Sequence, residues 1–345
     1  MPDREKLTYH AYRTAGAFLQ HLPGPVAGAT ATAVGLGLAG LRRDARALYA
    51  RHLRRVLGPD LSDAEVREMT RRAFVSYARY WFEGARLSST SPEKILGRMW
   101  VKSGFDHLVT GTQLGNGVIM ALPHVGSWEW GGAWLALNGF PMTSVAEPLA
   151  SEDLYEWFVK EREAMGLTIL KLDDEIGASL LRVLRAGRLV GLLCDRDLGG
   201  NGVEVEFFGE KTTLPAGPAT LAIRTGAALL PTAVYSGPGR DHTGLILPPI
   251  PTTRTGRLRE DVARITQLLA HDLERLIRRA PEQWHLFQPN WPSDTDGVDA
   301  RREGRSHLSS RVIRALGGST DRSSNGSART SPDLCTDRGE LEQAT

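Results

Sequence analysis

The sequence predicts an α/β protein with a central, mostly parallel sheet flanked by helices and with a helical N-terminal region. Three observations predict this fold. The first hundred residues are dense in helix formers, short apolar runs then alternate with helix-like stretches, and the chain ends in a polar segment with few large apolar residues. We therefore expect a helical region at 1–100, an α/β core at 101–292 and a disordered polar tail at 293–345.

The N-terminal region contains two predicted helices and one apolar stretch. Residues 42–57 are charged and rich in helix formers. Ser62 and Glu65 match a capping box, which predicts that a helix begins there and covers 64–87. The apolar stretch at 25–41 is rich in Ala, Gly, Thr and Val. It predicts either a small-residue helix packed closely inside the protein or a segment that contacts a membrane surface.

From residue 117 onward, strand-length apolar runs alternate with helix-like segments, as in a parallel sheet with crossover helices. The predicted strands are 117–122, 143–146, 168–170, 189–194, 203–208 and 229–235. The predicted helices are 128–137, 154–165, 175–186 and 216–225, followed by a long amphipathic helix at 261–279.

Composition and motifs exclude several classes of protein. A formal net charge of only +2 argues against a dedicated nucleic-acid binder. The chain has no phosphate loop, nucleophile elbow or zinc-ligand spacing, so neither a metal nor a bound cofactor is expected. The two cysteines, Cys194 in an apolar run and Cys335 in the tail, predict no bridge and a reducing cytoplasm. The charged N-terminus does not resemble a signal peptide.

The run PHVGSWE at 123–129 holds the strongest chemical signal. His124 directly follows a predicted buried strand, and Gly126 and Ser127 can make a turn. Ser127 is a candidate N-cap for the next helix, which places Glu129 in its first turn. Ligands of open α/β sheets bind at the carboxyl ends of strands, where this arrangement puts His124.

A histidine and a carboxylate that share a cleft have a recognisable chemistry. The carboxylate fixes the tautomer of the imidazole and favours its protonated form. The imidazole of His124 can then take a proton from a hydroxyl group that attacks a thioester, which is general-base catalysis of acyl transfer. The alternative is a structural histidine beside a solvated acid at Glu129, because this spacing is common by chance.

The run ALPHVGSWEWGGAWLA around His124 is one of five informative blocks. SYARYWFEGARL precedes it, and three blocks follow it: EPLASEDLYEWFVKEREAMGLTIL, LLCDRDLGGNGVEVEFFGEKTTLPAGPATLA and PEQWHLFQPNWP. In this order they resemble the lipid A biosynthesis acyltransferase superfamily and, within it, the phosphatidylinositol mannoside acyltransferase group. The resemblance covers roughly residues 5–292 and leaves out the tail.

The resemblance implies a peripheral enzyme on the cytoplasmic face of the cell membrane, in contact with the inner leaflet. It would move a fatty acyl chain, expected to be palmitoyl, from acyl-CoA as co-substrate to a mannose hydroxyl of mannosylated phosphatidylinositol. Two alternatives remain. One is an acyl-CoA-dependent acyltransferase acting on another glycolipid or on a lysophospholipid, and the other is a non-catalytic lipid-binding protein.

The resemblance also implies roles for single residues. The family's motif histidine is the base, so His124 takes that role, and Glu129 takes a structural or orienting one. A later carboxylate is expected to pair with the histidine. Glu204 and Glu206 are the candidates, because strand alternation puts both on one face, and we favour Glu204. The alternative for both is an exposed polar strand face.

Three further residues are expected to bind substrate. Glu147 and Arg162 fall in the block that the resemblance places beside the acceptor sugar; otherwise they are an ordinary surface acid and an exposed helix arginine. Asp195, Arg196 and Asp197 follow a predicted strand. Arg196 either binds phosphate through two parallel hydrogen bonds or pairs with its two flanking acids.

Overall fold

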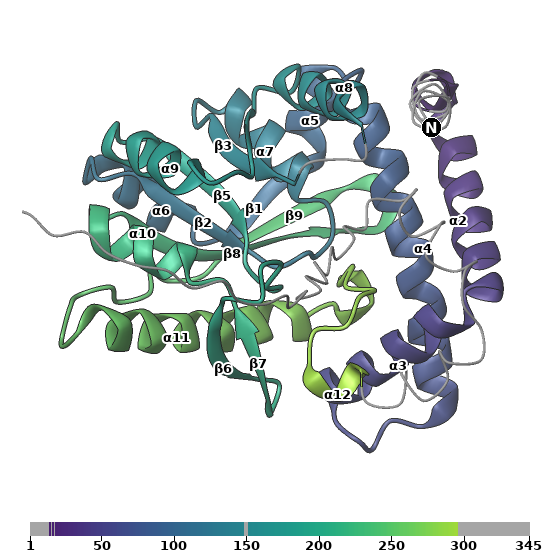
Figure 1. Ribbon diagram of the computed structural model, residues 1–345. Coiled ribbons are helices and arrows are strands. Elements are labelled where there is room, and N and C mark those ends of the chain that lie inside the picture. The colour runs from purple at the N-terminus through teal and green to yellow at the C-terminus, as the bar shows by residue number, and fades with distance from the viewer. Residues whose placement is uncertain (1–13, 15, 17, 148–150, 296–345) are drawn as a thin grey trace, which may run out of the picture.

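The computed structural model describes residues 14, 16, 18–147 and 151–295, and it confirms the expected α/β fold (Figure 1). The central sheet has seven strands in the order β1-β9-β8-β2-β5-β3-β4. Every neighbouring pair is parallel except β8 and β9. The strands are β1 Met99–Ser103, β2 Val118–Leu122, β3 Met142–Ala146, β4 Thr168–Lys171, β5 Leu189–Leu193, β8 Ala228–Ser236 and β9 His242–Ile246.

Helices cover both faces of the sheet, each over its own hydrophobic core. Strand β2 is buried on both sides, because Ile119 belongs to one core and Met120 to the other. A fully apolar strand is typical of such a central position. One face carries α9 (Ile176–Arg185), α10 (Gly217–Thr225) and α11 (Leu258–Arg278), and the other carries α5 (Pro92–Arg98), α6 (Phe105–Gln113), α7 (Trp128–Leu137) and α8 (Glu152–Glu163).

The helical N-terminal region stands beside this sheet (Figure 1). It consists of α2 (Gly24–Leu41), α3 (Arg43–Leu57) and α4 (Asp63–Leu87). The capping box at the start of α4 is confirmed, since Ser62 and Glu65 each bond the other's backbone N–H. Helix α4 lies between α2 and the sheet, so α2 reaches the core through this long helix.

Helix α2 has two different sides. On one side small residues at every fourth position pack closely on α4, where a side chain at Gly35 would meet the backbone of Val75. On the other side apolar residues face solvent, and Leu41 is 81% exposed. Of the helices in the described ranges, α2 alone is long and apolar enough to cross a membrane, judged by length and composition. One side of α2 therefore fits the close-packed helix that the sequence predicted, and the other side fits the alternative of a membrane-surface contact.

Strands β6 (Val203–Phe207) and β7 (Glu210–Leu214) form a separate antiparallel hairpin. The two residues between them, Phe208 and Gly209, both have positive φ angles, 53° and 77°. This is the turn geometry that matches the twist of a two-residue hairpin. The hairpin packs against α11 rather than extending the main sheet, so residues 203–208 do not form one of its strands as the alternating pattern indicated.

The expected tail at 293–345 lies almost entirely outside the described residues, as does Cys335. Its first three residues belong to the fold, because α12 covers Pro292–Thr295 and Asp294 is buried. At the other boundary the first strand begins at Met99, just before the expected start of the core.

Candidate active site

His124 lies at the carboxyl edge of the sheet, two residues after β2 ends. The chain then turns back against β8, and Gly126 makes this turn with a φ of 59°. A Cβ atom at Gly126 would come within 2.1 Å of the carbonyl oxygen of Val234. Glycine is required here for both reasons. The backbone of His124 is fixed in turn by the N–H of His285, which donates to its carbonyl oxygen at 2.7 Å.

The side chain of His124 is paired with Asp195. Strands β2 and β5 are parallel neighbours, with Leu122 opposite Leu193. His124 and Asp195 each follow these residues by two positions, so the register places them side by side. The Nδ1 atom of His124 lies 2.6 Å from Oδ1 of Asp195.

Asp195 is fully buried and held from three directions. Its Oδ2 accepts the backbone N–H of His124 at 2.9 Å and the indole N–H of Trp284 at 2.6 Å. Burial alone raises the pKa of Asp195. The positive charge of His124 and the hydrogen bonds from His124 and Trp284 outweigh this effect, so the pKa lies below its ordinary value. Asp195 is therefore an ionised acceptor at neutral pH.

This pairing fixes the proton on the imidazole. Because ionised Asp195 only accepts, the Nδ1 atom of His124 carries a hydrogen, and in the neutral imidazole the lone pair is on Nε2. The His124 side chain is 28% exposed, and no hydrogen bond within the described part of the chain uses Nε2. Such a nitrogen can take a proton from a hydroxyl group that approaches the sheet edge.

Glu129 does not pair with His124. It lies in the first turn of α7, as expected, but its carboxylate is buried and forms an ion pair with Arg162 of α8. Arg162 is itself buried, and its guanidinium stacks on the ring of Phe158. The pair joins α8 to α7 behind the histidine. Ser127 occupies the N-cap position of α7, yet its hydroxyl bonds Glu83 instead of the helix end.

The expectation that Glu204 or Glu206 pairs with His124 is wrong, because Asp195 fills that position. Both glutamates are on the outer face of the separate hairpin and are exposed. Glu204 pairs with Lys211 on β7 at 2.8 Å. The alternative, an exposed polar strand face, is what the structure contains.

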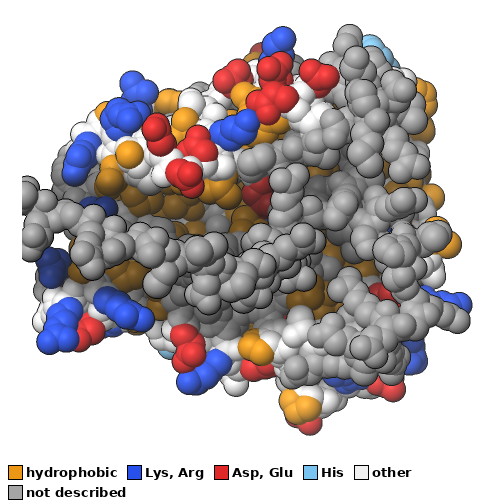
Figure 2. Space-filling view, in the orientation of Figure 1, with side chains coloured by type: hydrophobic (Ala, Val, Ile, Leu, Met, Phe, Trp, Pro, Cys, Tyr) orange, Lys and Arg blue, Asp and Glu red, His pale blue; other side chains and the backbone are white. Residues whose placement is uncertain are grey.

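Arg196 and Glu147 lie together at the same edge of the sheet. The Arg196 guanidinium pairs with Glu147 at 2.8 Å and donates to the side-chain oxygen of Gln288 at 2.6 Å. It therefore does not pair with its flanking acids. Both residues are partly exposed. Figure 2 shows charged side chains along the rim that α8 and α9 form, above a hollow in which hydrophobic side chains are visible.

An apolar slot lies between α7 and the sheet, and Leu122 and Trp128, on either side of the His124 turn, help to line it. Two consecutive glycines of α7, Gly131 and Gly132, let the helix approach the sheet, since a Cβ atom at Gly131 would lie 2.6 Å from Val234. The free volume is small, about 20 Å³. Its lining includes three methionines: Met99, Met120 and Met142.

The sequence indicated the position of His124 but missed three residues that complete its surroundings: Asp195, Trp284 and Asn290. Asp195 had been noted only as a neighbour of Arg196 at a strand end. A usable signal was present, because His124 and Asp195 each follow a predicted strand closely. It required the knowledge that β2 and β5 are adjacent, which depends on strand order.

A histidine with an unused ring nitrogen, a buried aspartate paired with it and an apolar slot near it form an arrangement that can activate a hydroxyl group next to an apolar group. The chain belongs to the bacterial lipid A biosynthesis acyltransferase family, whose sequence pattern matches residues 3–293. It is thus an acyltransferase.

Two relatives are similar over most of their length. A phosphatidylinositol mannoside acyltransferase of Mycolicibacterium smegmatis is 40% identical over 255 residues, which is 73% of this chain and 81% of that protein. A protein of the same name from Mycobacterium tuberculosis H37Rv is 41% identical over 226 residues, 64% of this chain and 69% of that protein. The resemblance seen in the sequence blocks is thereby confirmed.

Proposed function

We propose that this chain transfers a fatty acyl chain, palmitoyl in the first instance, from acyl-CoA to a mannose hydroxyl of a phosphatidylinositol mannoside. The observation that carries the proposal is the His124–Asp195 pair at the carboxyl edge of the sheet. The names of the two relatives support the choice of acceptor.

The proposed reaction is direct transfer with His124 as the base. Nε2 of His124 removes the proton of the mannose hydroxyl as its oxygen attacks the thioester carbonyl carbon. The tetrahedral intermediate then expels the coenzyme A sulfur, which receives that proton from the imidazolium. Asp195 stabilises the imidazolium between the two steps. Such a base contributes about 10²–10⁴-fold to the rate.

The apolar slot beside His124 supports a place for the acyl chain. Its lining is apolar and includes Leu122 and Trp128, which flank the turn that carries the base. At about 20 Å³ it has room for roughly one water molecule, so a chain enters only if side chains move. Met99, Met120 and Met142 are suited to this, because unbranched methionine adapts its shape at low cost.

The Arg196–Glu147 pair supports a polar acceptor at the same edge. Glu147 offers carboxylate oxygens to sugar hydroxyls, and Arg196 offers N–H groups to a phosphate. The Nε atom of Arg196 is buried without a partner among the described residues. A phosphate or sugar oxygen would satisfy it. Another glycolipid, or a lysophospholipid, presents the same two kinds of group and remains the alternative acceptor.

We further propose peripheral attachment at the cytoplasmic face of the cell membrane, through α2. Its outward side exposes apolar residues, and the paired arginines Arg42 and Arg43 lie where α2 meets α3. A helix that is apolar all round needs cover on every side. Anionic lipid headgroups of the inner leaflet would complement the two arginines.

The test uses purified protein with mixed acyl-CoAs and a glycolipid extract, followed by mass spectrometry of the products. We expect an acylated phosphatidylinositol mannoside and released coenzyme A. The alternatives give different results: another acylated lipid identifies another acceptor, and lipid binding without thioester consumption identifies a non-catalytic protein.

The role of the base is tested by His124→Ala. We expect a folded protein whose turnover is lower by about 10²–10⁴-fold. His271→Ala is the matched control, because His271 is exposed on α11 and bonds only Gln267. Near-normal acyl transfer by folded His124→Ala protein would contradict the mechanism.

A further inference from the structure

Residues 281–295, which we call the closing segment, bond Asp195 at two points. Trp284 donates its indole N–H to Oδ2 of Asp195 at 2.6 Å. Asn290 donates its side-chain amide to the carbonyl oxygen of Asp195 at 3.1 Å. Whatever fixes the closing segment therefore also fixes the carboxylate that orients His124.

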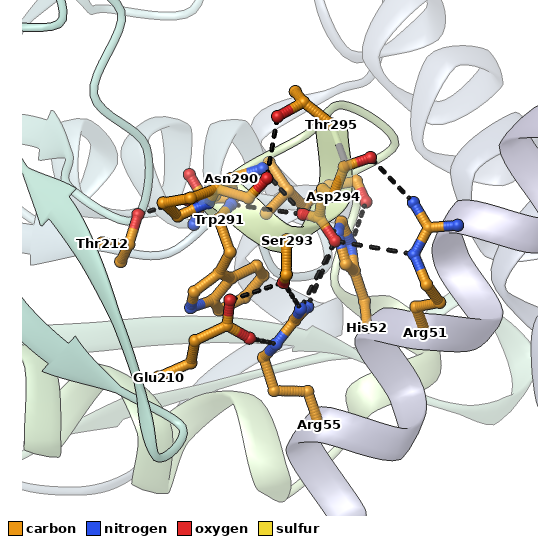
Figure 3. Close-up of polar contacts among 12 residues, drawn as sticks. Arg51, His52, Arg55, Glu210, Thr212, Asn290, Trp291, Ser293, Asp294 and Thr295 are labelled. Atoms are coloured by element: carbon orange, nitrogen blue, oxygen red, sulfur yellow. Dashed lines mark hydrogen bonds and ion pairs between the residues drawn. The ribbon is translucent and has the colours of Figure 1, made fainter. Parts of the chain in front are cut away.

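Asp294 anchors the closing segment at its far end (Figure 3). Its Oδ2 accepts the backbone N–H groups of Asn290 at 3.0 Å and Trp291 at 3.2 Å, and it lies 3.0 Å from Nε2 of His52. Its Oδ1 accepts from the guanidinium of Arg55 at 3.4 Å. Burial raises the pKa of Asp294, but these donors outweigh it and hold the pKa below its ordinary value. Asp294 is therefore a buried, ionised hub.

His52 of α3 is the buried side-chain partner of Asp294. Its ring is fully buried, with Nε2 toward Asp294 and Nδ1 3.2 Å from the carbonyl oxygen of Leu286. Both ring nitrogens therefore face an oxygen that accepts hydrogen bonds. A buried pair of this kind is stable only when its geometry is good and its other hydrogen-bonding positions are filled, as they are here.

Helix α3 also grips the closing segment at its start. The Tyr49 hydroxyl lies 2.6 Å from the carbonyl oxygen of Pro281 and 2.8 Å from that of Trp284. Burial raises the pKa of Tyr49, so its hydroxyl keeps the proton that it donates. Arg55 bonds Glu210 of β7 at 2.9 Å as well, which ties the hairpin to the same cluster. The closing segment is thus held at both ends by one helix.

Hydrogen bonds connect this cluster to the base through two intervening residues. His52 bonds Asp294, which accepts the backbone N–H of Asn290; the side chain of Asn290 donates to the backbone carbonyl of Asp195, whose carboxylate bonds His124. Asn290 is the critical step, because its backbone is held by one aspartate and its side chain holds the other. A clamp that served stability alone would not need to end on Asp195.

We propose that His52 and Asp294 are positioning residues for acyl transfer. They lock the closing segment so that Trp284 and Asn290 hold Asp195 in line with Nδ1 of His124. The kinetic consequence rests on the proposed function, but the effect on the His124–Asp195 hydrogen bond does not. Since no substrate needs to touch Asp294, the proposal predicts a loss in kcat rather than a rise in KM.

The experiment compares Asp294→Asn with Asp272→Asn. Asp272 is a matched control, because it lies on α11 and pairs only with Arg275. The first measurement is the NMR signal of the Nδ1 proton of His124, taken without substrate. We expect Asp294→Asn to move or broaden this signal. We also expect it to lower kcat by about 10- to 100-fold, with KM nearly unchanged. The control should leave both as in the unmodified protein.

A second variant keeps the test decisive if Asp294→Asn does not fold. Asn290→Ala removes the hydrogen bond from the side-chain amide to the backbone carbonyl oxygen of Asp195. It leaves the backbone contact of residue 290 with Asp294 in place. It should lower kcat by a smaller factor. It should also move the acid limb of the pH–rate profile to lower pH, because the imidazolium of His124 loses part of its support. A purely structural clamp would leave this limb in place.

Two results would separate the possible failures. Folded Asp294→Asn and Asn290→Ala proteins with an unchanged His124 signal and normal kcat would overturn the positioning role. A moved signal in a protein that transfers no acyl chain, even unmodified, would instead overturn the proposed function and leave the positioning intact.

Discussion

Two hydrogen-bonded histidine–aspartate pairs among the described residues differ in whether the second ring nitrogen of the histidine has a partner. In the His124–Asp195 pair the aspartate is buried and the histidine is 28% exposed, with only Nδ1 engaged. In the His52–Asp294 pair both side chains are buried, and both ring nitrogens of the histidine are engaged. The first pair has a nitrogen available for chemistry, whereas the second has none.

The difference teaches that the residue types alone do not define a catalytic pair. Each aspartate is an ionised acceptor whose pKa lies below its ordinary value. What separates the pairs is the second nitrogen of the imidazole. In His124 this nitrogen faces the sheet edge, so His124 is a candidate base. In His52 it faces the carbonyl oxygen of Leu286, so His52 has a structural role.

Among the substitutions that test the difference between the two pairs, Asp195→Asn should cause the largest loss of activity. The asparagine amide can donate to Nδ1 of His124, which moves the ring proton to Nε2 and removes the free lone pair. We expect kcat to fall by roughly 10²–10⁴-fold, measured as coenzyme A release. A folded variant that turns over at close to the normal rate would remove Asp195 from the mechanism.

The next test replaces His52 and His124 in turn with leucine and compares the resulting losses of stability. His52→Leu leaves Asp294 without its main buried partner, so the free energy of unfolding should fall by about 3 kcal/mol. His124→Leu also removes a partner from a buried carboxylate, but Asp195 keeps the Trp284 indole and the backbone N–H of residue 124 as donors, so we expect a smaller loss of about 1–2 kcal/mol. Urea unfolding of both variants measures this. Equal losses would show that the two pairs contribute alike to stability.

The buried histidine His242 offers a smaller test, because it has no hydrogen-bonded carboxylate. His242 stacks on Trp130, and Glu83 is 3.7 Å from its Nε2. Burial, followed by the charges of Arg79 and Arg98, lowers the pKa of His242 from 6.5 to about 3.

The unfolded chain therefore takes up a proton at His242 near pH 6.5, while the folded protein does not until about pH 3. Stability must fall as pH drops between these values, by about 1.4 kcal/mol per pH unit for one group. Urea unfolding at pH 6.5 and 5 should differ by roughly 2 kcal/mol from this histidine. The His242→Phe variant should lose that part of the slope, and an unchanged slope would assign it to other groups.

The smallest effect is expected for Glu204→Gln. This glutamate is exposed on the hairpin and pairs with Lys211 across the strands. Exposed pairs contribute little, so neither kcat nor stability should change measurably. Activity assays with Glu204→Gln and Glu206→Gln check this, and a strong loss in either would restore the glutamates as candidate partners of His124.

Local patterns in the sequence were enough to predict most elements of the fold. The predicted helix 128–137 coincides with α7, and β2 begins one residue after its expected start. Strands β1 and β9 were missed, because MWVKS and HTGLI are short and only partly apolar. They pair with each other at one edge, where a strand needs fewer apolar residues.

Only the part of the site at the end of β2 could be predicted from the sequence. His124 and its turn follow from the local sequence, and so does the place of Glu129 in the first turn of α7. The partners were not predictable, since they depend on which strands are neighbours. Asp195 needs β5 beside β2, and Glu204 was chosen because the hairpin could not be distinguished from a strand of the sheet. Trp284 and Asn290 lie far from Asp195 in the sequence, so local patterns do not link them to it.

The clamp between α3 and the closing segment also has a consequence for when the enzyme becomes competent. His52 and Asp294 are 242 positions apart in the chain. At 5–20 residues per second, a ribosome needs roughly 10 to 50 s to make the intervening polypeptide. Until then Asp195 lacks the donors at 284 and 290, although the strands on either side of it already exist. In a nascent chain Asp195 would thus lack these donors until residues 284–294 have been made and have folded against it.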